Sequence, residues 1–240
     1  MDYKIVIPSK DRVKDFTKMT YEKIIKKYNL PLNDVMVYVP KSNKKEYDEA
    51  FPDINIIVAP DGFFNTVKFI HKSLKDKQKF VYMNDDLTKI LKLVGGKLVE
   101  VKNFKDVINM VFNKMKEEGA NIAGFYPTPN PMFMEGRTPI TKDLRFIFDA
   151  LHFQINWKNI PLSIPSKLDF ESTIKYWERD GIVLRFNHYS MRTRFAKGRV
   201  ASVNEGKDTK DFERKYAKYV SKTIQHNNGT TSFLLKKNPE

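Results

Sequence analysis

Short runs of apolar and β-branched residues alternate with longer amphipathic stretches in the first half of the chain, and this alternation restricts the fold more than any other feature. The runs, which predict strands, span residues 3–8, 34–39, 54–58 and 80–83. The stretches between them, which predict helices, span residues 14–28, 42–51 and 65–74. Because crossover helices join parallel strands and cover both faces of the sheet, the pattern predicts an α/β fold with a mostly parallel central sheet flanked by helices.

The second half of the chain is less regular. The periodic segments there predict helices over residues 104–118, 169–179 and 210–225, and strands over residues 121–125 and 182–187. Proline and turn residues predict a loop over residues 128–139, and the aromatic stretch at residues 144–157 predicts hairpin strands. These elements indicate a subregion of hairpins and loops added to the sheet.

The composition excludes some chemistry and favours some partners. The 240 residues include no cysteine, which excludes disulfides, thiolate catalysis and zinc–thiolate sites. The net charge of +14 attracts polyanions and phosphorylated ligands, although a lysine-rich solvated surface gives the same balance. No apolar run reaches the roughly 20 residues that span a bilayer, and the N-terminus has no signal-peptide pattern. We therefore expect one soluble, cytoplasmic domain with no membrane partner.

Each predicted strand of the first half ends in polar residues, and ligands of parallel sheets bind at the carboxyl ends of the strands. The first strand ends in the sequence PSKDR, from Pro8 to Arg12. Its main-chain N–H groups, Lys10 and Arg12 can bind a nucleotide or its phosphates, but a plain strand-to-helix loop has the same sequence. The third strand is followed by Asp61 and Gly62, which suit either a ribose contact or a simple turn.

The fourth predicted strand ends in Asn84, Asp85 and Asp86. Two adjacent carboxylates repel each other when ionised, and a cation between them and a ligand makes the arrangement favourable. Magnesium and manganese ions prefer such oxygen ligands and commonly bridge to phosphates. The alternative is that Asn84 or Asp85 caps a helix beginning at residue 87.

Further candidates lie in the second half of the chain. Asp169 and Glu171 fall at the start of a predicted helix, where a carboxylate can serve as a general base or simply cap the helix. His188 ends a predicted strand and can complete a metal site or be structural. A basic run fits phosphate clamping as well as a solvated surface, and it contains Arg192, Arg194, Lys197 and Arg199.

Taken in chain order, these motifs resemble those of the GT-A glycosyltransferases over roughly residues 3–200. The resemblance rests on P-S-K-D-R after the first strand, D-G after the third, acids after the fourth, and a D-x-E helix followed by G-I-V-L-R-F-N-H. More narrowly, the sequence is similar to the small phage and viral transferases associated with TET-type base hydroxylases. Those enzymes are thought to act on hydroxymethylated pyrimidines in DNA.

The resemblance implies a metal-dependent glycosyltransferase whose donor is a nucleotide diphosphate sugar, with a UDP-sugar favoured. The D-x-D motif of the family falls on residues 84–86, where the first acid is replaced by Asn84. Asp86 is therefore the expected ligand of Mn²⁺ or Mg²⁺, with Asp85 facing the sugar and His188 as a late ligand. Asp169 or Glu171 is the implied base. The implied nucleotide-sugar site contains Pro8, Ser9, Lys10, Arg12, Asp61, Gly62, Asn84 and Asp85.

The resemblance also divides the single domain into a nucleotide-sugar half, an acceptor half, and a C-terminal helix and tail, at residues 1–118, 119–205 and 206–240. The net charge favours DNA as the acceptor, and a base paired in a duplex has to be flipped out. Tyr126, Phe133 and Phe148 can stack on that base or belong to the core. One alternative is a nucleotidyltransferase, which usually has a glycine-rich phosphate loop that PSKDR lacks. The other is a non-catalytic DNA-binding module.

Overall fold

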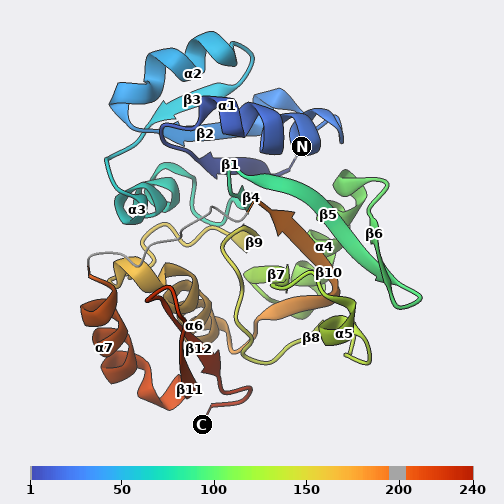
Figure 1. Cartoon of the computed structure of the whole chain (residues 1–240), viewed down its shortest axis with the longest axis vertical. Coiled ribbons are helices and arrows are strands. Elements are labelled where there is room, and N and C mark those ends of the chain that lie inside the picture. The colour runs from blue at the N-terminus through green and yellow to red at the C-terminus, as the bar shows by residue number, and fades with distance from the viewer. Residues whose placement is uncertain (1, 195–203, 240) are drawn as a thin grey trace.

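A ten-stranded sheet forms the centre of the molecule (Figure 1), seen in a computed structural model that describes residues 2–194 and 204–239. Its strand order is β3-β2-β1-β4-β9-β7-β10-β5-β6, and β8 pairs with β10. The strands of this sheet are β1 (Lys4–Pro8), β2 (Val35–Val39), β3 (Asn55–Val58), β4 (Lys79–Met83), β5 (Leu87–Val94), β6 (Lys97–Glu100), β7 (Ile122–Tyr126), β8 (Ile140–Thr141), β9 (Leu151–Ile155) and β10 (Leu184–Thr193). A separate hairpin contains β11 (Val220–Gln225) and β12 (Thr231–Leu235).

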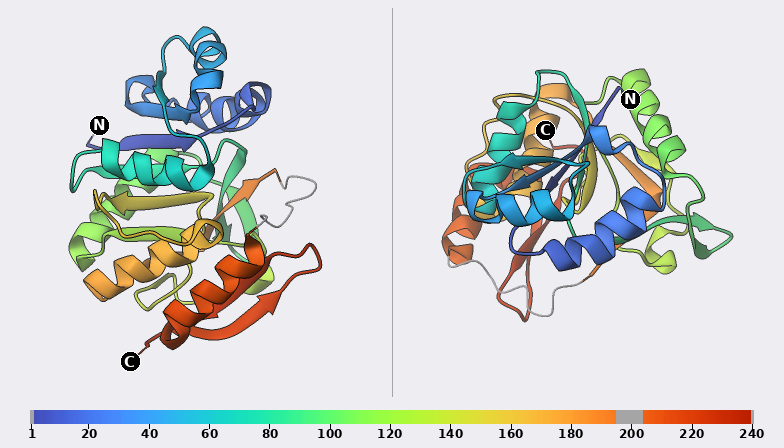
Figure 2. Two further views of the ribbon diagram at one scale, coloured as in Figure 1. Left: turned by 90° about the vertical axis from the view of Figure 1, so that its left-hand side faces the viewer. Right: turned by 90° about the horizontal axis from the view of Figure 1, so that it is seen from above.

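Helices cover both faces of the sheet, and Figure 2 shows α3 and α4 on opposite sides of it. The α-helices are α1 (Val13–Phe16), α2 (Lys44–Ala50), α3 (Phe63–Ser73), α4 (Phe104–Glu118), α5 (Pro131–Met134), α6 (Leu168–Asp180) and α7 (Glu205–Tyr216). A π-helical segment, η1 (Thr17–Lys26), continues α1, and short 3₁₀ turns are η2 (Leu32–Asp34), η3 (Lys41–Asn43), η4 (Pro165–Lys167) and η5 (Ala217–Tyr219). No helix in the described ranges is both long and apolar enough to cross a membrane.

The predicted α/β fold with a mostly parallel sheet is confirmed. Strands β3, β2, β1 and β4 are parallel neighbours, and β9, β5 and β8 run against the direction of the other strands of this sheet. Successive side chains of β1 enter different cores, because Ile5 and Ile7 pack with α4 and η1 whereas Val6 packs with α3. Burial on both faces explains why the strands read as continuous apolar runs.

The stretch at residues 144–157 does not form the predicted hairpin. It contains a single strand, β9, which lies between β4 and β7 and is antiparallel to both. The preceding residues are irregular, and Leu144 and Ile147 pack in the core around α6. The strand therefore finds its partners far away in sequence, and aromatic content alone did not reveal this.

The segment after Asp86 is a strand and not a helix, so the helix-capping alternative for Asn84 and Asp85 is wrong. Strand β5 pairs with β10 and with β6. Gly95 and Gly96 join β5 to β6 with positive φ angles of 53° and 72°, which is the conformation of a tight hairpin turn. The chain therefore re-enters the same sheet as β5 immediately after the two carboxylates.

The C-terminal segment forms a helix and a hairpin where one long helix was predicted. Helix α7 ends at Tyr216, and β11 and β12 follow it as an antiparallel pair. Stacking between Phe212 and Phe233 (ring centroids 4.4 Å apart) joins α7 to the hairpin, and the ring of Phe170 from α6 lies 5.3 Å from that of Phe233. This aromatic contact favours the hairpin over a continued helix.

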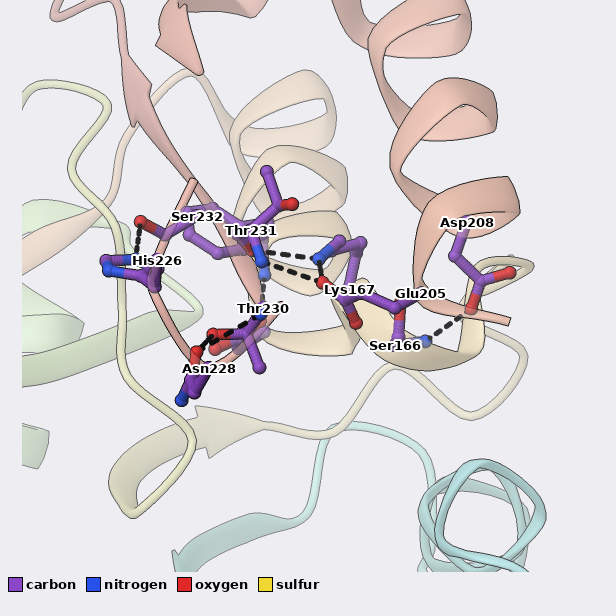
Figure 3. Close-up of polar contacts among 11 residues, drawn as sticks. Ser166, Lys167, Glu205, Asp208, His226, Asn228, Thr230, Thr231 and Ser232 are labelled. Atoms are coloured by element: carbon purple, nitrogen blue, oxygen red, sulfur yellow. Dashed lines mark hydrogen bonds and ion pairs between the residues drawn. The ribbon is translucent and has the colours of Figure 1, made fainter. Parts of the chain in front are cut away.

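One buried ion pair connects α6, α7 and the hairpin (Figure 3). The ammonium of Lys167, just before α6, contacts the carboxylate of Glu205 at the start of α7 and donates to the carbonyl of Thr231 at 2.8 Å. The N–H of Thr231 in turn donates to Glu205 Oε1 at 2.9 Å. Because the Lys167 side chain is only 2% exposed, each group depends on the others for its hydrogen bonds.

We predict that Lys167→Ala destabilises the protein by about 3–5 kcal/mol, because it leaves the buried Glu205 carboxylate without its cation. Urea denaturation measures the change. The matched control is Lys44→Ala, which removes an exposed ion pair with Asp48 and should cost at most about 1 kcal/mol. Equal losses for the two variants would contradict the role given to Lys167.

Candidate functional site

A cavity of about 390 Å³ lies at the carboxyl ends of β1, β2 and β4, beside the start of α3. Most of the residues predicted for the nucleotide-sugar site line it, namely Pro8, Ser9, Lys10, Arg12, Gly62, Asn84 and Asp85. Asp86 lines it as well. Asp61 is exposed and lies beside the cavity, since its neighbours Pro60 and Gly62 are lining residues. The structure therefore brings three separate strand exits to one place.

Asp85 is held by two side chains from the segment between β1 and α1, and a tyrosine from α2 supports one of them. Ser9 donates to Asp85 Oδ2 at 2.5 Å, and the hydroxyl of Tyr47 lies 2.6 Å from that of Ser9. Arg12 donates to Asp85 Oδ1 at 3.3 Å. Burial raises the pKa of Asp85, and the contacts with Ser9 and Arg12 offset only part of this effect. The carboxylate is therefore fixed in orientation, with both oxygens already hydrogen-bonded.

The loop between β1 and α1 has an unusual conformation that is held by Asn43, a residue that the sequence did not single out. Asp11 has a positive φ of 54°, which is unusual for a residue other than glycine. Asn43 stabilises this conformation, since its Nδ2 donates to Asp11 Oδ1 at 2.9 Å and its Oδ1 accepts from Asp11 N at 3.3 Å. Neither Asn43 nor Tyr47 was predicted from the sequence. Their contacts with Asp11 and Ser9 depend on how α2 and the turn before it pack against the end of β1.

Asp86 differs from its neighbour in having an unsatisfied carboxylate oxygen. Among the described residues no group hydrogen-bonds to its buried Oδ1. Burial, followed by repulsion from Asp85, raises the pKa of Asp86 to about 6. An unpaired carboxylate oxygen beside a second carboxylate fits a divalent cation that takes oxygen ligands. The described residues contain no cluster of three or more metal-binding side chains, so such an ion would need further oxygens from water or a diphosphate.

The structure does not bring His188 to this carboxylate pair. Thr193 of β10 pairs with Leu87, next to Asp86, whereas His188 lies earlier in β10, roughly 16 Å away along an extended strand. Its Nε2 is 3.0 Å from the carbonyl oxygen of Arg137. A metal role for this histidine stays a prediction.

Two of the four predicted basic residues lie near the carboxylates. The N–H of Arg194 donates to the carbonyl of Asp86 at 3.0 Å, and its guanidinium pairs with Asp15 at 2.8 Å. The exposed Arg192 lies in β10, beside β5. Lys197 and Arg199 lie outside the described residues.

Glu171 is a buried structural anchor in this fold. Its carboxylate accepts hydrogen bonds from Ser163 N (2.7 Å), Ser163 Oγ (2.7 Å), Ile164 N (2.9 Å), Tyr216 OH (2.8 Å) and Lys215 Nζ (3.0 Å). Burial alone would raise the pKa of Glu171, but these hydrogen bonds outweigh it and lower the pKa. A carboxylate saturated in this way is occupied in joining α6, α7 and the loop at Ser163.

Asp169 lies two residues earlier, in the first turn of α6, and lines a second cavity of about 400 Å³. This cavity is bounded by the starts of α3, α6 and α7, and it shares Gly62 and Phe63 with the first cavity. Its charged lining residues in the described part of the chain are all acidic, namely Asp149, Asp169, Glu205 and Asp208. A group bound there would have a carboxylate on one side and the first cavity on the other.

The aromatic residues considered for base stacking line neither cavity. The Tyr126 ring has the guanidinium carbons of Arg137 and Arg185 each 5.0 Å from its centroid. Phe133 is half exposed, and Phe148 packs against the main core. Their stacking role stays a prediction.

No protein-family model matches the sequence, and no curated protein has significant similarity to it. Solved structures do resemble the fold. A fragment of TarS from S. aureus, residues 1–349, aligns with a TM-score of 0.53 and 13% identity over 79% of this chain and 60% of that fragment. The same fragment in complex with UDP-GlcNAc aligns with a TM-score of 0.52 and 12% identity, over 82% of this chain and 60% of the fragment.

Glucosyl-3-phosphoglycerate synthase from Mycobacterium tuberculosis, in complex with phosphoglyceric acid, aligns with a TM-score of 0.55 and 11% identity over 97% of this chain and 86% of that one. The fold is GT-A-like. At these identities the likeness concerns the fold alone, and it confirms the predicted glycosyltransferase-like architecture. The three neighbours do not include a phage DNA glycosyltransferase, so the narrower resemblance stays a prediction.

We predict that Glu171→Gln destabilises the protein by about 2–4 kcal/mol at pH 7, because it removes a buried charge that several donors surround. The folded-state pKa of Glu171 is lowered, so its contribution is present above the ordinary value of 4.5 and is lost as pH falls through the folded-state pKa. Denaturation at pH 7 and near pH 3 should therefore show a difference that shrinks at low pH. A variant of unchanged stability would contradict the structural role.

Proposed function

We propose that the protein is a metal-dependent glycosyltransferase that moves a sugar from a nucleotide diphosphate sugar, with a UDP-sugar favoured, to a hydroxyl acceptor. The observation that carries this proposal is the unsatisfied, buried oxygen of Asp86 beside the fixed carboxylate of Asp85. The pair lines a cavity at the carboxyl ends of parallel strands in a GT-A-like fold. The similarity to a TarS fragment that was solved with UDP-GlcNAc supports the choice of donor.

The cavity offers groups suited to each part of the donor. Gly62 is the N-cap of α3, and no described side chain caps this helix, so the first N–H groups of α3, beginning with that of the lining residue Phe63, can bind a phosphate. Arg12 is half exposed and lies against Asp85, so it can contact the diphosphate without leaving its partner. We assign Lys10, Ser9 and Asp61 to the nucleotide. Asn84 lies beside the carboxylates, and Arg192 and Arg194 add positive charge near Asp86.

The residues around Asp86 fit Mn²⁺ or Mg²⁺, which Asp86 and Asp85 would hold. When bound, such an ion supplies Lewis-acid stabilisation of the negative charge on the leaving diphosphate. The chain itself holds the carboxylates in place through Ser9, Tyr47 and Arg12, so little reorganisation is needed when the donor binds.

Asp169 is the residue that we propose as the general base. In an inverting reaction the acceptor oxygen attacks the anomeric carbon, the bond from that carbon to the diphosphate oxygen breaks, and the acceptor proton passes to the Asp169 carboxylate. The second cavity, which Asp169 lines, shares Gly62 and Phe63 with the donor cavity, so an acceptor there lies next to the transferred sugar.

A hydroxymethylated pyrimidine in DNA is the acceptor that the sequence resemblance and the net charge of +14 favour. The acidic lining of the second cavity restricts how DNA would bind. A flipped, neutral base carrying its hydroxymethyl group can enter the cavity, whereas the phosphates would remain at the basic outer surface. This requirement is specific enough to be tested against small neutral acceptors.

We predict that Mn²⁺ with UDP raises the melting temperature of the protein at pH 7.5, and that Asp86→Asn removes the manganese-dependent part of this shift. Without metal, Asp86→Asn should stabilise the protein by about 1–2 kcal/mol at pH 7.5, after allowance for solvent screening. The folded-state pKa of about 6 exceeds the ordinary 3.8, so the stability from the protonated form is present below pH 4 and is lost as pH rises through 6.

Asp53→Asn is the control for this experiment, because the Asp53 side chain is exposed and is not in the lining of the cavity. Thermal shifts with and without Mn²⁺ at pH 4 and 7.5 separate the two effects. Full retention of the manganese-dependent shift by the Asp86→Asn variant would refute the metal assignment.

We predict that Asp169→Asn lowers the turnover rate by about 10²–10⁴-fold and leaves UDP binding, measured by calorimetry, within about twofold of wild type. Transfer from each UDP-sugar is measured by mass spectrometry with hydroxymethylated DNA, unmodified DNA and neutral glycans as acceptors. The control is Asp180→Asn at the other end of α6, where Asp180 pairs with Arg179. Loss of UDP binding in Asp169→Asn would show that the base assignment is wrong.

The same panel separates the two alternative functions. A nucleotidyltransferase would release pyrophosphate from a nucleoside triphosphate and would not need a sugar donor. A non-catalytic module would bind DNA with a salt-dependent affinity and show no turnover with any donor.

A further inference from the structure

A small third cavity, of about 30 Å³, lies beneath α3 and α6 and is continuous with the acceptor side of the site. It shares Asp149, Leu168 and Asp169 with the second cavity. Its floor is formed by Tyr82 of β4 and His152 of β9, which are directly paired across the two strands. Their rings stack with centroids 4.6 Å apart.

Three polar atoms of the residues that line this cavity are buried and have no hydrogen-bond partner among the described residues. They are the Tyr82 hydroxyl, His152 Nδ1 and the Ser172 hydroxyl. Tyr82 is only 3% exposed and His152 only 9%. Because buried polar groups in native proteins are nearly always paired, three such atoms around one small cavity indicate a shared partner.

The cavity has room for a water molecule, and the three unpaired polar atoms stand out in a lining that is otherwise mostly apolar. A buried water molecule typically makes about three hydrogen bonds. Tyr82 and Ser172 each offer a hydroxyl, and His152 offers a ring nitrogen. One water in this cavity would satisfy all three groups and lie within the same lining set as Asp169.

The surroundings of this cavity keep its donors neutral. Burial lowers the pKa of His152 to about 3 and that of the neighbouring His71 to about 4, so both imidazoles are uncharged at neutral pH. Burial, then the charges of Asp149, Asp85 and Asp169, raises the pKa of Tyr82. The phenol therefore stays protonated, and it lies within electrostatic reach of carboxylates in both the donor and the acceptor cavities.

Among the described residues, the charged groups that line the second cavity with Asp169 are carboxylates. Asp149, from the segment before β9, lines both cavities, whereas Asp208 from α7 and Glu205, which is ion-paired with Lys167, line only the second. From α3 the titratable group that lines the third cavity is the neutral His71. The N–H of Phe170 already donates to Asp169 Oδ1 at 2.9 Å, and a further hydrogen bond donated to a carboxylate favours the ionised form that a base requires.

We propose that Tyr82 is a positioning residue for Asp169, acting through a water molecule that it holds together with His152 and Ser172 and that donates a hydrogen bond to the Asp169 carboxylate. This inference rests on the proposed function. Tyr82 orients the base and keeps it ionised, and it does not touch the acceptor or the donor sugar. The stacked His152 ring fixes the position of the phenol.

Tyr82→Phe tests the proposal, because it removes one oxygen atom and keeps the stacked ring. We expect the turnover rate to fall about tenfold and the acid limb of its pH profile to move up by about one unit, since the Asp169 pKa rises when a donor is lost. The KM for the sugar donor should stay within about twofold of wild type. Ser172→Ala removes a second partner of the water and should shift the profile in the same direction.

The matched control is Tyr3→Phe. The Tyr3 hydroxyl is also buried and unpartnered among the described residues, but Tyr3 is in none of the three cavities. A Tyr82→Phe enzyme with the wild-type turnover rate and pH profile would overturn the proposal. A raised donor KM with unchanged turnover would also overturn it, because it would indicate direct contact with the donor.

A second measurement is independent of turnover. Carbon-13 NMR of carboxyl-labelled aspartate, assigned with Asp169→Asn, gives the Asp169 pKa in wild type and in Tyr82→Phe. We expect a higher pKa in the variant, and an unchanged value would refute the link. If the wild-type enzyme transfers no sugar, the proposed function fails, whereas the NMR comparison still decides whether Tyr82 acts on Asp169.

Discussion

The hydrogen bond between Ser9 and Asp85 joins the ends of two neighbouring strands and is the contact on which the site depends. Ser9 follows β1 and Asp85 follows β4, so the bond fixes the spacing between two strand exits at the mouth of the sheet. Tyr47 reaches the same serine from α2, and Arg12 reaches the same aspartate from the loop after β1. Because Asp85 is satisfied in this way, its neighbour Asp86 is left as the carboxylate with oxygen available for a ligand.

The charge distribution distinguishes the cavity that we propose for the donor from the one that we propose for the acceptor. The donor side combines Lys10 and Arg12 with the aspartate pair, which suits a diphosphate and its cation. The acceptor side has carboxylates and neutral groups in its described lining, although the whole chain carries a net charge of +14. Under the proposed function, a positive chain attracts a polyanion over long distances while the acceptor cavity admits only its uncharged part.

Much of the fold of residues 1–118 could be predicted from sequence, because the hydrophobic periodicity and the turn residues there indicate the same strands and helices. The strand ending at Met83 and the polar residues after it were sufficient to place Asp85 and Asp86 at the carboxyl end of a strand in a parallel sheet. The return of the chain as β5 was missed, since LTKIL after two acids is also typical of a helix start, and the turn at Gly95 and Gly96 was not recognised. The preference for Asp169 over Glu171 as the proposed base required the structure, because residues two apart point to different sides of a helix and only packing shows which side is buried.

The buried ion pair at Lys167 has a consequence for how such an enzyme can diversify. It attaches α7 and the β11–β12 hairpin to the start of α6, and these elements supply Asn204, Glu205, Asp208 and Thr230 to the acceptor wall. None of those residues contributes to the donor cavity. Under the proposed function, acceptor choice is encoded in a late, locally anchored stretch of sequence, which selection can remodel while the donor chemistry is inherited intact.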